Sequence, residues 1–224
     1  MQRGKLISIE GSDGSGKNTQ TNLLVERLNK EGIICVKSGY PRYNTPTGKI
    51  VGGPFLGKPE IGESFFKNPS KVDAITAAYY YAADRRDAHK DIIHTLKSGI
   101  NLIMDRYVES SMAHQGGKAK TLQERKRIIK KIGKMEYGLS EMPRPDKTIF
   151  LYMPYDVVTK LIKEKDKVES DEEYLRNSED VFLYMAKKLR WKRITCAPDN
   201  TLTSLKTPEE IHEEVYKYII KVIS

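Results

Sequence analysis

Residues 5–19 read KLISIEGSDGSGKNT. The apolar run 5–10 has the composition of a buried strand, and glycines crowd the segment that follows it. Helical periodicity begins at Thr19 and continues to Lys30. A strand, a glycine-rich turn and a helix in this order bring backbone N–H groups and the positive end of a helix to one point. This stretch therefore predicts a phosphate-binding loop at the edge of a sheet.

The loop has the spacing of a P-loop, with Gly11, four further residues, Gly16 and then Lys17. In such a loop the backbone cradles the phosphates of a nucleoside triphosphate, and the lysine reaches the terminal ones. The alternative is a tight strand-to-helix turn with an incidental lysine. We predict that the loop binds ATP and that Lys17 is catalytic. The residues expected to contact ATP are Gly11, Ser12, Asp13, Gly14, Ser15, Gly16, Lys17, Asn18 and Thr19.

One position departs from the motif. Asn18 stands where a P-loop has Ser or Thr, whose hydroxyl ligates Mg²⁺. An amide oxygen is also a magnesium ligand, although its reach differs from that of a hydroxyl. Two alternatives follow. Either Asn18 substitutes as the ligand, or the metal relies on phosphates, water and a carboxylate elsewhere in the chain.

Strand-like and helix-like segments alternate along the rest of the chain. Strand-like runs occupy residues 5–10, 33–38, 101–105, 147–152 and, more weakly, 192–196. Stretches with helical periodicity occupy residues 19–30, 71–97, 121–137, 171–190 and 207–222. This alternation predicts an α/β fold, a P-loop NTPase-type three-layer sandwich whose five-stranded, mostly parallel sheet has helices on both faces. Ligands of such sheets bind beyond the carboxyl ends of the strands.

Composition narrows the class of protein further. The chain has 224 residues, of which 38% are hydrophobic and 31% charged, with a mean hydropathy of −0.57. It is long enough to bury a core without disulfides, and it has no apolar run of about 18 residues that could cross a membrane. Cys35 and Cys196 stand singly, so we expect neither a disulfide framework nor a zinc cluster. We expect one cytoplasmic domain spanning residues 1–224.

The formal net charge of +9 is concentrated in one segment. Residues 118–134 (KAKTLQERKRIIKKIGK) carry eight basic side chains and one acidic side chain, or +7. Such a stripe is one signature of nucleic-acid binding. The apolar residues Leu122, Ile128, Ile129 and Ile132 fall near helical spacing, however, which favours a solvated helix face and no nucleic-acid partner. A small anionic substrate would be drawn by the same positive field.

Further segments after the predicted strands narrow the function. These segments are YPRY at 40–43, YAADR at 81–85, DRY at 105–107 and SSMAHQG at 110–116. Together with DGSGK at 13–17, in this order and spacing, the sequence resembles the thymidylate kinase family of P-loop nucleoside monophosphate kinases, over residues 5–220. The resemblance implies transfer of the γ-phosphoryl of ATP to dTMP, a Mg²⁺ cofactor and a homodimer.

Two residues on the second predicted helix suit a pyrimidine base. Tyr81 and Arg85 are four residues apart and so share one helix face. An aromatic ring there can stack on the base while the guanidinium donates to a base carbonyl. The family usually has Phe at the position of Tyr81. Without the resemblance, Tyr81 is an ordinary packing residue and Arg85 a surface ion-pair residue, and these alternatives stay open.

The resemblance assigns further roles on the acceptor side. Ser111 would contact the base edge, and His114 would lie against the deoxyribose, where relatives often have Tyr. Arg42 and Arg106 would clamp the acceptor phosphate, a task suited to planar groups with several donors. Asp13 would accept a hydrogen bond from the sugar 3′-hydroxyl. Asp13 and Arg106 are also expected to be catalytic.

The remaining expectations for this side concern the metal and the rest of the substrate pocket. Asp105 would position Mg²⁺ or its waters. Without the resemblance, Asp105 and Arg106 would form a strand-end salt bridge. The further residues expected to bind the substrate are Tyr40, Tyr43 and Gln115.

The family closes a lid over the donor phosphates and carries a transition-state arginine either in the P-loop or in this lid. The P-loop here has no arginine, which implies the lid at about residues 160–171. Lysines stand there, and a lysine can neutralise the transferred group as a point charge. The candidate lid residues are Lys163 and Lys165 as catalytic cations, Arg176 as a further cation, and Asp166 and Glu169 toward the acceptor or its metal. The alternative is a solvated charged loop.

Other functions remain open at this point. One is a kinase for dUMP, for a wider set of pyrimidine monophosphates or for a deoxynucleoside, because Tyr81 and His114 depart from the family pattern. Another is a nucleotide-binding regulator with weak turnover, because of Asn18 and the arginine-free lid. A P-loop ATPase acting on nucleic acid is a third, although it would leave the acceptor-side segments without a purpose.

Overall fold

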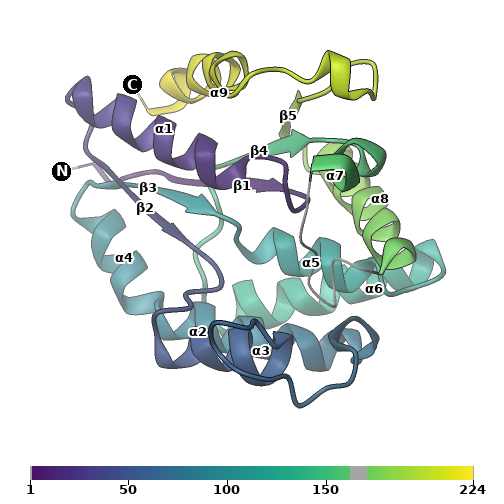
Figure 1. The fold of residues 1–224 in the computed structure, drawn as a ribbon. Coiled ribbons are helices and arrows are strands. Elements are labelled where there is room, and N and C mark those ends of the chain that lie inside the picture. The colour runs from purple at the N-terminus through teal and green to yellow at the C-terminus, as the bar shows by residue number, and fades with distance from the viewer. Residues whose placement is uncertain (1, 162–170, 224) are drawn as a thin grey trace.

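The fold is built on a parallel sheet (Figure 1). The computed structural model describes residues 2–161 and 171–223. Its strands are β1 (Leu6–Gly11), β2 (Cys35–Gly39), β3 (Asn101–Asp105), β4 (Lys147–Tyr152) and β5 (Lys192–Thr195). Within these residues they form one sheet of order β2-β3-β1-β4-β5 in which every pairing is parallel. The prediction of a P-loop type α/β fold is confirmed.

The helices agree with the predicted periodicity at most positions. They are α1 (Lys17–Lys30), α2 (Pro46–Ile50), α3 (Ala74–Asp87), α4 (His89–Lys97), α5 (Val108–Gly116), α6 (Leu122–Gly133), α7 (Tyr155–Leu161), α8 (Glu172–Lys188) and α9 (Pro208–Ile223). Two π-helical turns, η1 (Val51–Leu56) and η3 (Lys134–Leu139), follow α2 and α6, and two short 3₁₀ turns, η2 (Pro69–Lys71) and η4 (Leu202–Ser204), complete these elements.

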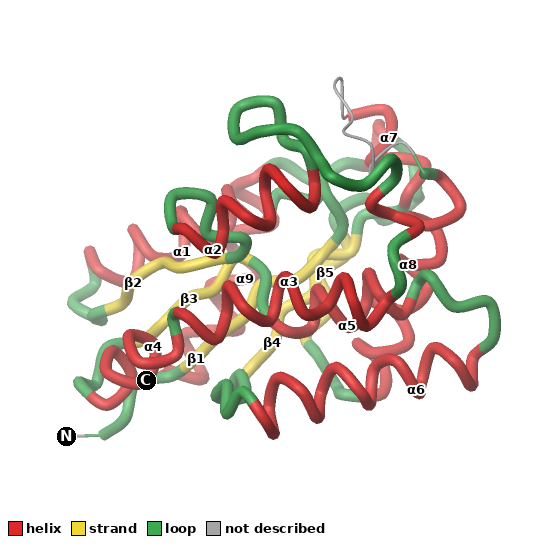
Figure 2. The backbone as a smooth tube through the Cα atoms, turned by 90° about the horizontal axis from the view of Figure 1, so that it is seen from below, coloured by secondary structure: helices red, strands yellow, loops and turns green. Residues whose placement is uncertain are grey.

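Helices cover the sheet on both faces (Figures 1 and 2). One face carries α1 and α9, whose Leu24, Leu28 and Val215 pack with the strands in one apolar cluster. The other face carries α3, α4, α5, α6 and α8, which share a second cluster with residues such as Phe150 and Phe182. The sheet is therefore buried on both sides, as its continuous apolar strands predict.

Two differences from the predicted helices have clear local causes. The helix predicted over 71–97 begins only at α3, because Asp73 accepts hydrogen bonds from the backbone N–H groups of Ile75 and Thr76 and caps it. Helix α5 was not predicted at all. Nearly all of its residues are buried, including the polar Glu109, Ser110 and Ser111, so the segment shows no amphipathic period.

Most of the basic segment 118–134 lies in helix α6, which spans Leu122–Gly133. Its Thr121 and Glu124 make a reciprocal capping box at the start of the helix. Ile132 is fully buried, and Ile128 and Ile129 pack against the apolar cluster of this face. The basic side chains of α6 therefore lie on the outer part of an amphipathic helix, as the spacing of its isoleucines indicates.

The stacked rings of Phe150 and Phe182 allow the contribution of the core to stability to be tested by substitution. Phe150 is 2% exposed and stacks on Phe182 of α8 with ring centroids 5.5 Å apart. We expect Phe150→Ala to lower the free energy of unfolding by about 3–5 kcal/mol, because it leaves a cavity that the packed rings cannot fill. Phe65, which is 83% exposed, provides the control. Urea denaturation should leave Phe65→Ala within about 0.5 kcal/mol of wild type, and equal effects of the two substitutions would contradict this account.

Cys35 and Cys196 are both buried and free. Within the described ranges, no helix has the length and apolar character needed to cross a membrane. The predicted lid residues Lys163, Lys165, Asp166 and Glu169 lie outside the described residues.

Candidate active site

The P-loop lies between the end of β1 and the start of α1. Gly16 adopts a left-handed conformation, φ 83°, at the N-cap of α1, a backbone that favours glycine. Lys17 is the first residue of the helix, and its side chain turns back over the loop so that Nζ donates to the Ser12 carbonyl at 2.7 Å. Lys17 is only 6% exposed. The loop therefore presents a sheltered ammonium group beside the N-terminus of a helix, which suits a phosphate.

Arg106 connects the P-loop to the segment after β3. Its guanidinium forms an ion pair with the Asp13 carboxylate. Its Nη1 donates to the Gly11 carbonyl at 3.3 Å and to Ser110 Oγ at 3.2 Å, and lies 3.5 Å from His114 Nε2. Arg106 has φ 65°, a left-handed backbone that is costly for a residue with a side chain and is typical of functional sites. The structure thus brings these predicted site residues together.

Burial and neighbouring charges shift the pKa values of Lys17, Asp13 and His114 in this cluster. Burial and the nearby Arg106 lower the pKa of Lys17 to about 8, so that Lys17 is still mostly charged at pH 7. Burial opposes ionisation of Asp13, but Arg106 and Lys17 outweigh it and hold the pKa of Asp13 below its usual value. Burial and Arg106 lower the pKa of His114 to about 3. At neutral pH the cluster therefore holds cationic Lys17 and Arg106, anionic Asp13 and a neutral imidazole.

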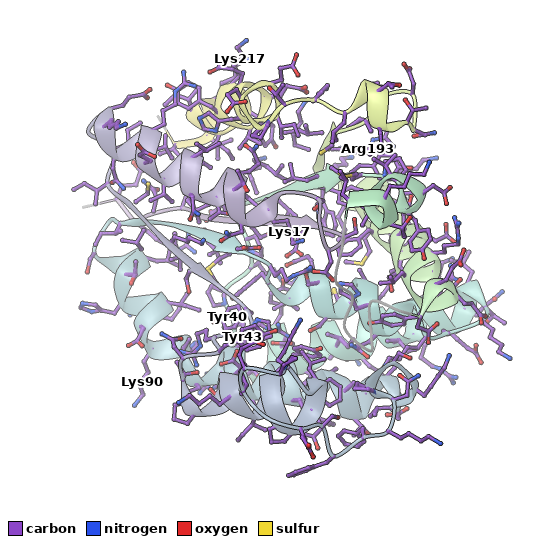
Figure 3. All side chains as sticks on the ribbon, in the orientation of Figure 1. Lys17, Tyr40, Tyr43, Lys90, Arg193 and Lys217 are labelled. Carbon is purple, nitrogen blue, oxygen red and sulfur yellow. The ribbon has the colours of Figure 1, made fainter. Side chains whose placement is uncertain are left out.

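A cavity of about 110 Å³ opens beside this cluster. It lies between the P-loop, the segment after β2, and helices α3, α5 and α8. Figure 3 labels Lys17 of the P-loop and, after β2, Tyr40 and Tyr43. Nine predicted site residues line it, namely Asp13, Tyr40, Tyr43, Tyr81, Arg85, Arg106, Ser111, His114 and Gln115. Residues from distant parts of the sequence thus meet at the carboxyl edge of the sheet, where a ligand is expected.

The cavity wall contains buried polar atoms without a hydrogen-bond partner among the described residues. They are Tyr40 Oη, His114 Nδ1 and Gln115 Oε1. Buried polar atoms in native proteins are normally paired, and leaving one unpaired costs free energy. Because these atoms belong to residues that line one cavity, a polar ligand bound there can supply their partners.

Tyr79, Tyr80 and Tyr81 are consecutive on α3, and each has different surroundings. Tyr81 lines the cavity and meets Phe55 of η1 edge to face at 5.6 Å. Tyr80 stacks on Phe55 at 4.8 Å, and Tyr79 is 59% exposed. Of these consecutive tyrosines, Tyr81 is therefore the one that lines the small cavity.

Arg42 lies differently from the sequence expectation. Its Nε donates to Asp84 at 3.1 Å, and its Nη2 donates to Asp87 at 2.6 Å. Arg42 is not among the residues that line the cavity, whereas its neighbours Tyr40, Pro41 and Tyr43 are. Two carboxylates of α3 hold this guanidinium, so the structure does not bring it into the cavity.

The two predicted metal ligands, Asn18 and Asp105, have different surroundings. Asn18 Oδ1 accepts a hydrogen bond from Lys37 Nζ, which also donates to Asn22. Asp105 ends β3 and contributes to the field at Lys17 and Arg106. Within residues 2–161 and 171–223, no group of three or more His, Cys, Asp and Glu side chains is arranged to hold a metal. The carboxylate of Asp105 fits magnesium chemistry, whereas the oxygen of Asn18 is engaged by an ammonium group.

Arg176, the further lid candidate, lies on α8. It forms ion pairs with Asp156 of α7 at 2.6 Å and with Glu172 at 2.8 Å, and its guanidinium lies 4.3 Å from the centre of the Tyr155 ring. In this arrangement Arg176 joins α7 to α8 at the surface.

Sequence reasoning missed several residues of the site. Tyr174 of α8 lines the cavity and stacks on His114 with ring centroids 6.0 Å apart. Glu10 is fully buried and accepts from the Tyr107 N–H at 2.8 Å and from Ser110 Oγ at 2.5 Å, which fixes the turn that carries Arg106. The position of Glu10 directly before the P-loop was a usable signal. Nothing local in the sequence marks Tyr174.

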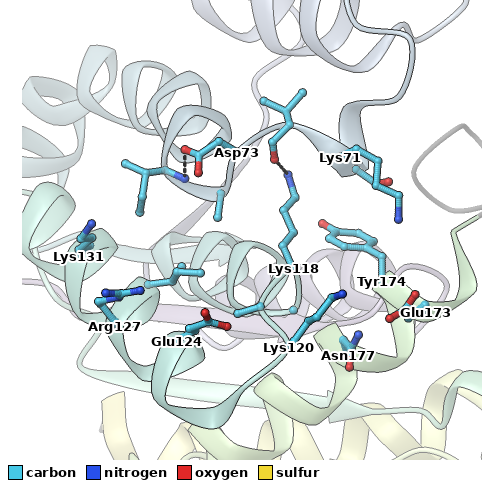
Figure 4. Close-up of a pocket in the computed structure, with 17 residues that line it drawn as sticks. Lys71, Asp73, Lys118, Lys120, Glu124, Arg127, Lys131, Glu173, Tyr174 and Asn177 are labelled. Carbon is cyan, nitrogen blue, oxygen red and sulfur yellow. Dashed lines mark hydrogen bonds between the residues drawn. The ribbon is translucent and has the colours of Figure 1, made fainter.

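A larger cavity of about 1020 Å³ lies between the starts of α3, α6 and α8 (Figure 4). Its lining includes Lys71, Lys118 and Arg127. Lys118 Nζ donates to the Val72 carbonyl at 2.7 Å, and Asp73 caps α3, as the dashed lines in Figure 4 show. Lys118 and Asp73 thus hold the backbone at the start of α3.

Comparisons with known proteins agree with the geometry. The family model for thymidylate kinase matches residues 9–204. Thymidylate kinase of Prochlorococcus marinus strain MIT 9312 is 33% identical over 200 residues, covering 87% of this chain and 89% of the relative. A probable thymidylate kinase of Methanocaldococcus jannaschii is 30% identical over 213 residues, covering 95% and 94%. The solved structure of thymidylate kinase from Candida albicans has a similar fold, with a TM-score of 0.72 at 23% identity over 98% of this chain and 92% of the other. The chain belongs to the thymidylate kinase family.

Proposed function

We propose that this protein transfers the γ-phosphoryl group of ATP to dTMP, giving dTDP and ADP. The observation that carries the proposal is the small cavity that Asp13 of the P-loop lines together with Tyr81, Arg85, Ser111 and His114. Membership of the thymidylate kinase family favours dTMP over the other acceptors, and it favours an enzyme over a regulator or a nucleic-acid ATPase.

The acceptor needs little acid–base help. An oxygen of the dTMP phosphate is already ionised near pH 7 and can attack the γ-phosphorus directly. Catalysis then consists of alignment and of stabilising negative charge that spreads over the transferred group. Lys17 faces the donor phosphates and Arg106 the acceptor phosphate, while the Asp13 carboxylate, kept ionised by Arg106 and Lys17, accepts from the 3′-hydroxyl.

A magnesium ion, if it enters with ATP, would neutralise phosphate charge in the same place. We assign its protein contact to Asp105, directly or through water, because a carboxylate is a preferred oxygen ligand. We do not assign it to Asn18, whose oxygen accepts from Lys37. The phosphates and water would then complete the coordination.

Selection for deoxyribose involves two rings. His114 is smaller than the tyrosine that relatives often have, but Tyr174 stacks on it and lines the same cavity. We propose that the pair together fills the space that a 2′-hydroxyl would need. The neutral state of His114 allows this packing without a buried charge.

A coupled ADP-release assay tests the function. ATP and Mg²⁺ are supplied with dTMP, dUMP, UMP, dCMP, dGMP or thymidine, and with no acceptor. We expect turnover with dTMP well above every other acceptor. Preference for another monophosphate would keep the mechanism and overturn the roles of Tyr81, Ser111 and His114. Binding of ATP and dTMP without turnover would favour a regulator.

Arg85 is expected to bind the base. We predict that Arg85→Ala raises the KM for dTMP by about tenfold or more and leaves kcat little changed, because the base lies away from the reacting phosphates. The variant also leaves Glu136 buried without its partner, so KM is measured at a temperature at which circular dichroism shows it folded. Arg86→Ala, on the adjacent and half-exposed arginine, is the control. A wild-type KM for Arg85→Ala would remove this residue from the acceptor site.

Two further proposals rest on family resemblance. We propose that the protein works as a homodimer in the cytoplasm. Tyr79 of α3 and Leu122 of α6 are exposed apolar side chains that such an interface could cover. Analytical ultracentrifugation tests the dimer, and a monomer at micromolar concentration would contradict it.

A further inference from the structure

Arg85 is held by a carboxylate that the acceptor-site proposal does not use. Glu136 of η3 is fully buried, and Arg85 is 2% exposed. Arg85 Nε donates to both Glu136 oxygens, at 2.9 and 3.0 Å, and Nη2 donates to Oε1 at 2.5 Å. This two-pronged arrangement fixes both the position and the plane of the guanidinium.

The arrangement decides which donors of Arg85 remain for a ligand. Nη2 also donates to Ser111 Oγ at 2.5 Å, so Nε and Nη2 are fully engaged. Among the described residues, Nη1 has only a long contact of 3.5 Å to the Tyr107 carbonyl. Arg85 and Ser111 both line the substrate cavity. Nη1 of Arg85 is therefore the donor that remains for a bound base, while Nε and Nη2 bind the Glu136 carboxylate.

The backbone around Glu136 suits this task. Helix α6 ends at Gly133, and the π-helical turn η3 continues from it. In this wider turn, Glu136 faces Arg85 while the next residue, Tyr137, donates its hydroxyl to the buried Glu109. The Glu136 carbonyl also accepts from the Met142 N–H at 3.0 Å. Single π-helical turns occur frequently at functional sites, where they redirect side chains.

We propose that Glu136 is a positioning residue for base recognition, which fixes Arg85 so that a single N–H edge meets the base. A donor fixed in this way donates to the 4-carbonyl oxygen of thymine or uracil and disfavours the 4-amino group of cytosine, because two donors would face each other. The inference rests on the proposed contact between Arg85 and the base. It assigns the selectivity of that contact to a residue far from the phosphates.

Glu136→Gln tests the proposal with little change of shape. The substitution removes the charge and points an N–H₂ group at a donor, so Arg85 is no longer fixed. We expect the KM for dTMP to rise by about tenfold. The preference for dTMP over dCMP, measured as the ratio of kcat/KM values, should fall by a similar factor, while kcat for dTMP and the KM for ATP stay within about threefold. Glu141→Gln, which alters the exposed carboxylate paired with Arg86, is the matched control and should leave all of these values unchanged.

A double-mutant cycle separates positioning from a general structural effect. If Glu136 acts through Arg85, then Arg85→Met and the double variant Arg85→Met/Glu136→Gln have the same KM for dTMP. An independent rise of KM in the double variant, or a wild-type KM and selectivity in folded Glu136→Gln, overturns the proposal. Should Glu136→Gln fail to fold, Glu136→Asp keeps the charge at a longer distance. A smaller loss of selectivity is then expected, and wild-type selectivity overturns the proposal.

The wild-type enzyme is the reference in the same experiment. If it does not phosphorylate dTMP, the proposed function fails. If it does so and selectivity is insensitive to Glu136, only the positioning role fails.

Discussion

Replacing Lys17 by alanine is expected to abolish phosphoryl transfer, with kcat falling by about a thousandfold or more. Lys17 begins α1 directly after the P-loop, is 6% exposed, and turns its ammonium group over the loop toward the Ser12 carbonyl. The transferred phosphoryl spreads its negative charge in the transition state, so loss of this cation costs more in kcat than in substrate binding. The measurement is ADP release with ATP and dTMP, on protein shown to be folded by circular dichroism.

Lys30→Ala provides the matched control for this result. Lys30 lies at the opposite end of the same helix, is exposed, and pairs with Glu26 at 2.6 Å. Its removal changes the net charge equally and should leave kcat within about twofold of wild type. Turnover of Lys17→Ala within about tenfold of wild type would show that this loop does not carry the catalytic cation.

Replacing Arg106 by methionine is expected to lower kcat/KM for dTMP by about a hundred- to a thousandfold. Arg106 pairs with Asp13 and reaches the Gly11 carbonyl and Ser110, so it joins the P-loop to the acceptor side. Its loss removes a charge from the acceptor phosphate and leaves Asp13 without the partner that keeps it in place. Because the donor phosphates keep Lys17, the KM for ATP should change by less than about threefold.

Arg190→Met is the control for Arg106→Met. Arg190 also has a left-handed backbone, φ 55°, but it is exposed at the end of α8. It therefore reproduces the change of side chain on a similar backbone away from the cavity. The measurement is kcat/KM for dTMP in both variants. Equal values would contradict a direct role for Arg106.

Local patterns predicted the sheet and the P-loop, and the family resemblance predicted most of the residues that line the small cavity. The strands appear as apolar runs because a parallel sheet is covered on both faces, and burial of this kind leaves a continuous signal. The resemblance pointed to Tyr81 and Arg85, and helix geometry added that residues four apart share one face. The motif residues Asp13, Ser111 and His114 were found by family resemblance, and the structure brings them to one cavity.

Other features of the structure depend on contacts between residues that are far apart in the sequence, and local patterns do not contain this information. Helix α5 is surrounded by protein, so its polar residues are buried and its period is hidden. Arg42 and Arg85 each find carboxylates, Asp84 and Glu136, that lie 42 and 51 residues further along the chain. The energy of a buried charge depends on which partners reach it, and packing alone brings those partners together. The sequence by itself therefore determined the fold and the class of chemistry, whereas only the packed structure determined which carboxylate holds each of these arginines.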